Sequence, residues 1–183
     1  MYGHNYTVPG TYEVTIVVTN RKPVFGEIVG STRTGGETPH LKPSALGLAV
    51  LNNEIPKIHH YYPMVDVWQV CLMPDHIHLI VRINEPLPVG KHLGIIIGAF
   101  KGGVSRAWWQ ILETTVPEAS ASETPLREPL FEPNYNDHIL MRDGQLENWK
   151  RYLRDNPRRL MMRIEYPDLF RRTLCIVIGG IRN

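Results

Sequence analysis

The chain has 183 residues, of which 43% are hydrophobic and 21% are charged, and its net charge is +2. These values predict one globular domain with a sizeable core, and no apolar run reaches the roughly 18 residues of a transmembrane helix. The first residues do not match a signal peptide, and the two cysteines, Cys71 and Cys175, show no zinc-binding spacing. We therefore expect a cytoplasmic protein with reduced thiols and no membrane partner.

The first half of the chain alternates between strand and helix patterns. Residues Thr11 to Thr19 predict a strand, and Pro43 to Tyr61 predict a helix that is interrupted or ends near Pro56. Two further strand-like runs, Val65 to Met73 and His76 to Ile83, are separated only by a Pro-Asp turn. This arrangement predicts a β-hairpin.

The second half begins with a helix pattern at Lys91 to Leu112, despite four internal glycines. We expect the last core strand within Phe131 to Met141, and the pattern of Asp143 to Arg159 predicts a third helix. This helix should end near Asn156, because Pro157 disfavours helical geometry in the residue before it. Antiparallel neighbours and helices in this order predict an α+β fold.

We interpret residues 1–183 as a single domain. Residues 30–40 and 113–129 are rich in Gly, Pro, Ser, Thr and Glu, which predicts mobile loops rather than domain boundaries. Residues 158–183 form a basic tail whose structure the sequence does not define. The apolar run at 174–178 leaves open an edge strand or a contact in a homodimer.

A pair of histidines is the most informative feature of the chain. His76 and His78 lie two residues apart in a predicted strand, and side chains at this spacing project to the same face. Two imidazole nitrogens can then bind one divalent ion: zinc, copper, iron or nickel or, with carboxamide, carboxylate or water ligands, manganese or magnesium. The alternative is structural, with one histidine packed in the core and the other solvated.

The third predicted helix offers a further ligand. Tyr152 and Asn156 are four residues apart, so a phenol and a carboxamide share one helix face. Considered alone, Tyr152 is typical of a core or interface tyrosine, and Asn156 is typical of a helix end before proline. Their occurrence together with the histidine pair favours a functional site.

These motifs together resemble the single-tyrosine HUH transposases, in particular the REP-associated tyrosine transposases. The resemblance rests on PDHIH at 74–78, NYNDHIL at 134–140 followed by Arg142-Asp143, and RYLRDNP at 151–157, and it spans residues 12–157. It implies a ferredoxin-like antiparallel sheet with helices packed on it and the histidines on a central strand. It also implies that His76, His78 and Asn156 bind a divalent metal, magnesium or manganese, while a tyrosine attacks single-stranded DNA.

Two tyrosines compete for the role of nucleophile. Tyr135 is followed four residues later by Ile139, which cannot bind a metal, whereas Tyr152 is followed by Asn156, so we favour Tyr152. A tyrosine phenol ordinarily has a pKa of about 10 and needs activation, which a metal that orients the phosphate can support. By resemblance, attack gives a 5′-phosphotyrosine and a free 3′-hydroxyl. The sequence does not identify a general base.

Positive charge is concentrated around Tyr152. The segment from Lys150 to Arg172 holds eight basic and three acidic residues, an excess of five that leaves the remainder near −3. Such a patch predicts salt-dependent DNA binding, although a solvated helix face is the alternative. The residues that we expect to contact single-stranded or hairpin DNA are Lys101, Arg106, Lys150, Arg151, Arg154 and Arg158.

Two other functions remain open. In the first, the protein is a metal-dependent hydrolase or nuclease in which His76 and His78 activate water and Tyr152 is structural. In the second, it is a non-catalytic nucleic-acid-binding domain. Only the transposase interpretation predicts a covalent protein–DNA species that survives denaturation.

Overall fold

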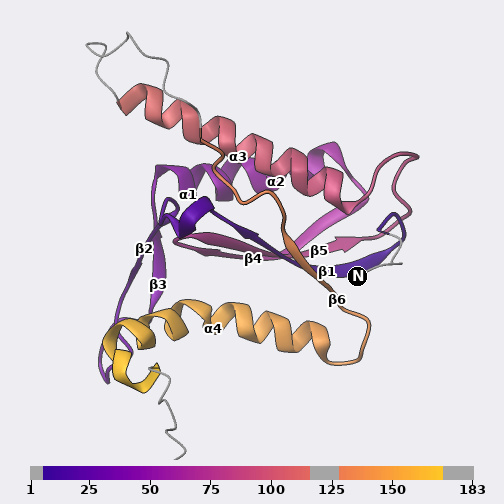
Figure 1. Ribbon diagram of the computed structural model, residues 1–183. Coiled ribbons are helices and arrows are strands. Elements are labelled where there is room, and N and C mark those ends of the chain that lie inside the picture. Colours follow the sequence, from indigo (N-terminus) through magenta and orange to yellow (C-terminus); the bar gives the residue numbers. More distant parts are fainter. Residues whose placement is uncertain (1–5, 116–127, 171–183) are drawn as a thin grey trace, which may run out of the picture.

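The computed structural model describes residues 6–115 and 128–170, and its centre is an antiparallel sheet of four strands with helices on both faces (Figure 1). The strands are β1 (Gly10–Val17), β4 (Val65–Met73), β5 (His76–Ile83) and β6 (Asn136–Ile139). They lie in the order β4-β5-β1-β6, with helices between β1 and β4 and between β5 and β6. This is the βαββαβ order of a ferredoxin-like fold. The predicted α+β fold, with the histidine strand in the centre of the sheet, is confirmed.

One face of the sheet carries the larger hydrophobic core. The alternation of β1 and β5 sends every second side chain to this face. Those that are fully buried there include Val14, Ile16, Ile77, Leu79 and Val81. The covering helices are α1 (Ala45–Ala49), a π-helical turn (Val50–Glu54), α2 (Ile55–Tyr61) and α3 (Leu93–Thr115), all on the upper side in Figure 1.

The first helical segment begins two residues later than the sequence predicts. Pro43 ends strand β3, and Ser44 caps α1 because its hydroxyl oxygen accepts a hydrogen bond from the Gly47 amide at 3.1 Å. Pro56 lies in the first turn of α2, directly after the π-helical turn, and because it has no N–H it cannot bond back to that turn. The predicted interruption therefore appears as a π-helical turn just before Pro56.

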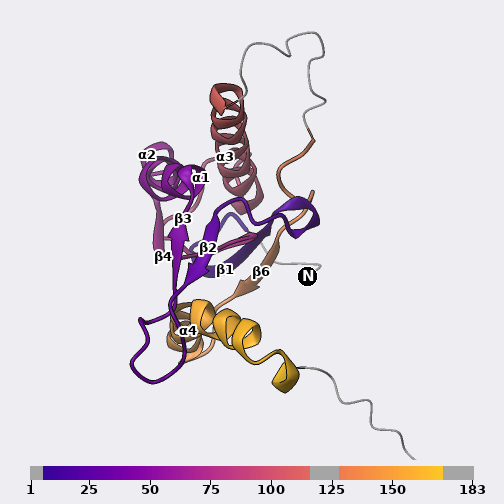
Figure 2. The same cartoon turned by 90° about the vertical axis from the view of Figure 1, so that its left-hand side faces the viewer.

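A second hairpin, which the sequence analysis did not predict, extends from this layer to the other side of the sheet. It consists of β2 (Gly26–Val29) and β3 (His40–Pro43), paired antiparallel. Figure 2 shows it descending to the far end of helix α4. The expected loop at 30–40 is the tip of this hairpin. It is held by Glu165, whose carboxylate accepts hydrogen bonds from the Ser31 hydroxyl (2.5 Å) and the Thr32 amide (3.1 Å).

Helix α4 covers the other face of the sheet and runs from Gln145 to Glu165. The prediction that this helix ends near Asn156 is therefore wrong. Pro157 lies inside the helix and removes one backbone hydrogen bond. The helix continues because residues beyond the proline are anchored by packing: Met161 is buried, and Leu160 contacts the small core under the helix. Tertiary burial thus outweighs the local cost of the proline.

The first part of the expected basic tail is ordered. Residues 158–165 belong to α4, and Pro167–Phe170 form a short 3₁₀ turn. The apolar run at 174–178, including Cys175, lies outside the described residues. Within residues 6–115 and 128–170, no helix combines the length and the apolar character needed to cross a bilayer.

A small separate core fixes α4 on the sheet. Its buried members are Cys71, Met73, Ile80 and Leu153, and Ile28, Leu146, Trp149 and Leu160 pack around them. Leu153 is 1% exposed, so the middle of α4 is pressed against the sheet. The residues on either side of Leu153 are thereby held over the strand that carries the histidines.

The Glu165 contact makes the hairpin tip sensitive to acid. Hydrogen bonds from Ser31 and Thr32 lower the pKa of Glu165 below its ordinary 4.5. A carboxylate whose pKa is lower in the folded state stabilises that state above the unfolded pKa, and this contribution disappears as the pH falls through the folded pKa. We expect hydrogen-exchange protection of the Thr32 amide to fall below about pH 4.5. Glu165→Gln should remove this pH dependence, and an unchanged profile in that variant would contradict the assignment.

Gly47 is expected to be intolerant of any side chain. A Cβ there would collide with the carbonyl oxygen of Phe25 and lie 3.0 Å from Cβ of Pro43. Gly47→Ala should lower the free energy of unfolding by about 1–3 kcal/mol, the usual cost of overpacking, in urea denaturation. Gly98→Ala in α3 is the matched control, because no atom lies within 4 Å of a Cβ there. That control should gain up to about 1 kcal/mol from helix propensity; equal effects of the two changes would refute the packing argument.

Candidate active site

The histidine pair lies on the face of the sheet that α4 covers. As their spacing predicts, the rings of His76 and His78 are neighbours, with centroids 4.8 Å apart and planes at 85°. Their side chains are 16% and 9% exposed, so both are largely shielded from water. Burial lowers the pKa of His76, against an opposing effect of the Asp75 carboxylate. This shift favours the neutral imidazole, the form that binds metals.

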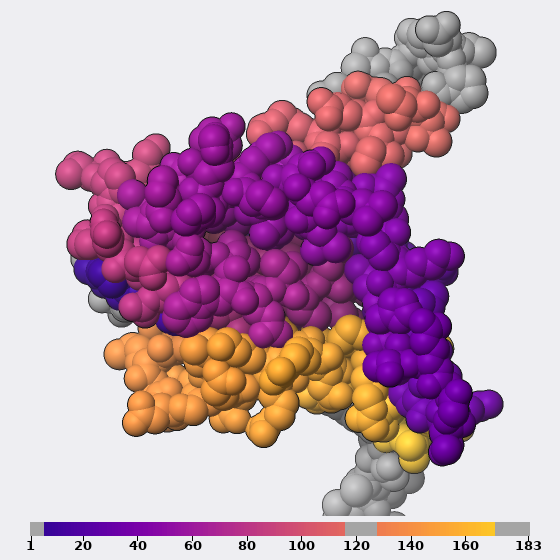
Figure 3. Space-filling model, turned by 180° about the vertical axis from the view of Figure 1, so that it is seen from behind, coloured from indigo at the N-terminus to yellow at the C-terminus, as the bar shows by residue number. Residues whose placement is uncertain are grey.

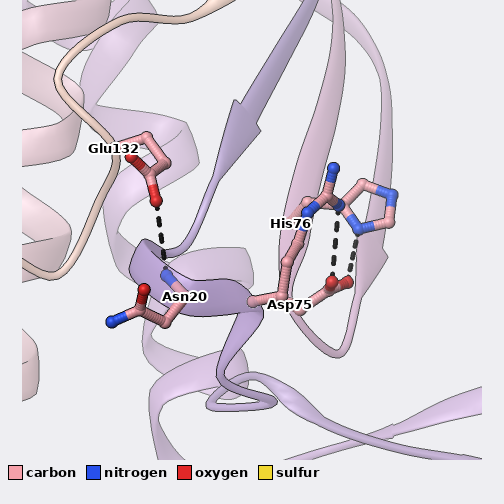
Figure 4. Close-up of polar contacts among 5 residues, drawn as sticks. Asn20, Asp75, His76 and Glu132 are labelled. Carbon is pink, nitrogen blue, oxygen red and sulfur yellow. Dashed lines mark hydrogen bonds and ion pairs between the residues drawn. The ribbon is translucent and has the colours of Figure 1, made fainter.

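Each histidine uses its Nδ1 atom for a contact within the protein. The Asp75 carboxylate in the turn before β5 lies 2.6 Å from Nδ1 of His76 (Figure 4). Nδ1 of His78 lies 2.9 Å from Oε1 of Glu13 and 2.8 Å from the hydroxyl of Thr15. The Nε2 atom of each ring is thus the nitrogen left for a further ligand.

Helix α4 places Tyr152 beside the histidines. The centroids of the Tyr152 and His78 rings are 6.3 Å apart, and Trp149 contacts the tyrosine edge-on at 5.5 Å. The guanidinium carbon of Arg159 lies 4.9 Å from the centre of the tyrosine ring. Tyr152 is 37% exposed, so a substrate can reach it. Arg159 is not among the site residues predicted from the sequence, although its spacing of seven residues from Tyr152 places the two on one helix face.

The competing tyrosine is directed elsewhere. Tyr135 packs against the larger core, and a Cβ at Gly94 of α3 would lie 3.4 Å from its hydroxyl. Burial, with a further contribution from Asp137, raises the pKa of Tyr135. The structure therefore brings Tyr152, and not Tyr135, to His78.

Asn156 lies one turn beyond Tyr152, next to Cys71 on strand β4. Burial raises the pKa of the Cys71 thiol to about 11, and the Asn156 side chain partly offsets this effect. Cys71 is the cross-strand partner of His78, so Asn156 lies over the strand that neighbours the histidines. Among the residues that the structure describes, the buried side-chain polar atoms without a hydrogen bond are Nδ2 of Asn156 and Oε2 of Glu13.

These two atoms lie on the face of the sheet that α4 covers, and they bear on whether a cation fits there. A buried polar atom without a partner is costly, and rotation of the Asn156 carboxamide would exchange its nitrogen for a ligating oxygen. In residues 6–115 and 128–170, no group of three His, Cys, Asp or Glu side chains could hold a metal. A cation would therefore have two imidazoles and neutral oxygen donors, with the other positions filled by water or phosphate. The imidazoles suit zinc, copper, iron or nickel, and together with oxygen atoms of a carboxamide, water and phosphate they can also complete a manganese or magnesium site.

A surface hollow of about 340 Å³ adjoins the histidines at the β6 edge of the sheet. Its walls include Thr15, which contacts His78, and Arg21, whose guanidinium lies 3.4 Å from the Asp75 carboxylate. The hollow therefore lies beside a residue that contacts His78, and because Glu132 also lines it, its wall carries charges of both signs.

The predicted DNA contacts divide between the two sides of the sheet. Lys101 and Arg106 lie on α3, whereas Tyr152 lies on α4 (Figure 1). The Lys101 ammonium donates to the carbonyl oxygens of Glu132 (2.6 Å) and Pro133 (3.1 Å), so it closes the end of a loop. The structure therefore does not bring these two residues to the tyrosine.

The other four predicted contacts lie along α4, which forms the orange to yellow band in Figure 3. Arg151, Arg154 and Arg158 are exposed, and Arg158 pairs with Asp155 at 3.6 Å. Lys150 is half-buried, pairs with Glu147 at 3.0 Å and lies 5.8 Å from the Trp68 ring centre. With Arg159, these residues place five cations before and after Tyr152 in the sequence of the helix.

No known protein-family profile matches the chain. In sequence it is 22% identical over 176 residues to an uncharacterized protein of Haemophilus influenzae. The aligned region covers 84% of this chain and 83% of that protein. Its structure resembles that of a REP-associated tyrosine transposase bound to a REP hairpin, with a TM-score of 0.56 and 15% identity over 87% of this chain and 73% of the other. A chain provisionally named a transposase, from Deinococcus radiodurans, gives a TM-score of 0.47 at 13% identity over 85% and 96%. At these identities, the likeness to the first structure shows a shared fold.

Proposed function

We propose that this protein is a DNA transposase of the single-tyrosine HUH type, which cleaves and rejoins single-stranded DNA through Tyr152. The observation that carries the proposal is the meeting of three rings from two elements distant in sequence. Tyr152 on α4 lies 6.3 Å from His78, which lies 4.8 Å from His76 on β5. The shared fold with a REP-associated tyrosine transposase supports this proposal.

In the proposed reaction, the Tyr152 oxygen attacks the phosphorus of a DNA phosphodiester. A phosphotyrosine bond forms at the 5′ side of the break, the bond to the 3′ oxygen breaks, and that oxygen takes up a proton to leave as a 3′-hydroxyl. The phenol proton passes to solvent or to a group that the residues described above do not identify. Attack by a 3′-hydroxyl on the phosphotyrosine reverses the step and rejoins strands without nucleotide hydrolysis.

The surrounding residues have separate roles. His76, His78 and Asn156 would hold a divalent cation, magnesium or manganese, which supplies Lewis-acid polarisation of a phosphate oxygen when bound. The permanent positive charge of Arg159, 4.9 Å from the centre of the Tyr152 ring, would stabilise negative charge that develops at the phosphate during attack. Trp149 packs against the edge of the tyrosine ring and limits its rotation.

The test is a search for the covalent intermediate. The protein is incubated with a pool of single-stranded hairpin oligonucleotides and manganese, and the products are separated under denaturing conditions. A label at the 3′ end of the DNA should appear on the protein, and a label at the 5′ end should appear on a shorter free strand. A hydrolase would release both fragments, and a binding module would cleave nothing; either result would overturn the proposal.

Binding is expected to favour single-stranded or hairpin DNA over perfect duplex and to weaken with salt. The exposed arginines of α4 would neutralise about three or four phosphates, so log K should fall with log salt at a slope of roughly −2 to −3. Duplex would satisfy the charges, but it would not expose a backbone to Tyr152. Fluorescence anisotropy at several salt concentrations measures both effects.

A pair of variants refines this measurement. Arg154→Ala should reduce the slope by about 0.7, the contribution of one phosphate contact on a single strand. Arg106→Ala, on the opposite layer, should change it less because Arg106 is separated from Tyr152 by the sheet. Equal affinity for hairpin and duplex, or a slope near zero, would contradict the proposed mode of binding.

A further inference from the structure

Glu13 has an unusual position for a carboxylate. Strand β1 sends Tyr12, Val14 and Ile16 into the larger core, so Thr11, Glu13 and Thr15 lie on the face toward α4. Glu13 is 0% exposed and occupies the centre of the sheet, between β5 and β6. Burial of a carboxylate is costly unless its oxygens are satisfied, and Oε2 of Glu13 has no partner.

The other oxygen of Glu13 belongs to a three-membered hydrogen-bond group. The Thr15 hydroxyl donates its only hydrogen to Oε1 of Glu13 at 2.8 Å. Nδ1 of His78 lies 2.9 Å from that carboxylate oxygen and 2.8 Å from the Thr15 hydroxyl oxygen. An ionised carboxylate can only accept, and a hydroxyl that has given its hydrogen can only accept. Nδ1 of His78 must then be the donor.

We propose that Glu13 is a positioning residue that, with Thr15, holds the proton of His78 on Nδ1 and leaves Nε2 available for the divalent cation. This inference rests on the metal-binding role proposed above for His78. A carboxylate on the far nitrogen of a metal-binding histidine fixes the tautomer and the orientation of the ring and makes the other nitrogen a better ligand.

His76 also has a carboxylate at its Nδ1 atom, supplied by the turn before β5. The Asp75 carboxylate lies 2.6 Å from Nδ1 of His76, so that ring also keeps Nε2 for a ligand. Asp75 is next to His76 in sequence, whereas Glu13 reaches His78 across two paired strands. Two independent carboxylates thus prepare two adjacent rings in the same tautomer, which is the state that a shared cation requires.

Stability alone does not account for Glu13. A buried carboxylate carries a desolvation cost that an unbranched apolar side chain of similar size does not carry. Glu13→Met, which is unbranched and similar in size, should therefore fold. If Glu13 only supports packing, this variant should bind cations as the original protein does.

The experiment uses the protein alone, without DNA, in two measurements. Manganese binding is followed by electron paramagnetic resonance, and the ring nitrogens of His78 are observed by ¹⁵N NMR at about pH 8 without metal. In the original protein, the spectrum should show a single Nδ1–H tautomer. Glu13→Met should lose that single tautomer and bind manganese about 10–100-fold more weakly. Glu13→Gln, which keeps an oxygen acceptor, should recover part of the affinity.

Other variants keep the test decisive. Thr11→Val removes a hydroxyl from the same face of β1 and should leave both readouts unchanged. Thr15→Val replaces Glu13→Met if the latter does not fold, and should weaken manganese binding in the same direction. Unchanged affinity or an unchanged tautomer in folded Glu13→Met or Thr15→Val would overturn the inference.

The outcome is separable from that of the proposed function. If Glu13→Met weakens manganese binding but no covalent DNA adduct forms, the inference stands and the transposase proposal fails. If the adduct forms and Glu13→Met binds manganese normally, only the inference fails. Absence of any manganese binding by the original protein would overturn the inference together with the metal site.

Discussion

Tyr152→Phe is expected to abolish formation of the covalent DNA adduct, with a fall of more than about 10⁴-fold in the cleavage rate. The change removes one hydroxyl and leaves the ring contacts with Trp149, His78 and Arg159 in place. Folding and affinity for single-stranded DNA should therefore stay close to those of the original protein. The measurement is a denaturing gel of the 3′-labelled adduct, together with anisotropy and thermal unfolding.

Tyr135→Phe is the matched control. It makes the same chemical change at the other tyrosine of the family-like motifs, whose hydroxyl approaches Gly94 on the opposite side of the sheet. The adduct should form at nearly the normal rate in this variant. If the Tyr135 variant lost the adduct and the Tyr152 variant kept it, the assignment of the nucleophile would be wrong.

The hairpin of β4 and β5 could be predicted to the residue, because its signals are local. Both strands have apolar, β-branched runs, and Pro74-Asp75 provides the turn between them. The observed bounds, Val65–Met73 and His76–Ile83, match the expectation. The shared face of His76 and His78 is also a local property, because side chains two residues apart in a strand project to the same side of the sheet.

The far end of α4 could not be predicted from local rules. Pro157 is a strong signal for a helix end, yet the helix continues for eight more residues to Glu165. What decides is burial of Met161 and the docking of the hairpin tip on Glu165, both of which depend on distant parts of the chain. The β2–β3 hairpin was missed for a related reason: its strands have four residues each and flank a connector rich in Gly and Thr.

Some features of the candidate site also follow from local sequence signals, whereas others depend on distant parts of the chain. Spacing in the sequence favours Tyr152 over Tyr135 as the nucleophile, and the structure places the Tyr152 ring near His78. The contact between Glu13 and His78 could not be foreseen, because it depends on the register of β1 against β5. Lys101 likewise looks like a DNA contact in sequence, but its ammonium is engaged by backbone carbonyls that come from a distant loop.

His76→Ala is expected to weaken manganese binding by at least about 100-fold and to prevent formation of the adduct. Loss of a direct ligand should cost at least as much as loss of a residue that only orients one, which is about 10–100-fold. The side chain of His76 is 16% exposed and its partner Asp75 also contacts Arg21, so the fold should tolerate the change. Electron paramagnetic resonance of manganese measures the affinity, and the 3′-labelled DNA measures the adduct.

His138→Ala provides the comparison that separates ligation from general effects on this face of the sheet. His138 lies on β6, on the same face as His78, but its ring stacks on Trp149 at 5.4 Å rather than on the histidine pair. Loss of the stacking should affect the packing of α4, whereas manganese affinity should remain within about threefold, because no proposed ligand is removed. If both histidine variants lost manganese equally, the cation would not be held by the β5 pair in particular. If His76→Ala bound manganese normally, the metal site would have to be sought elsewhere, and cleavage by Tyr152 would need another explanation for the activation of the phosphate.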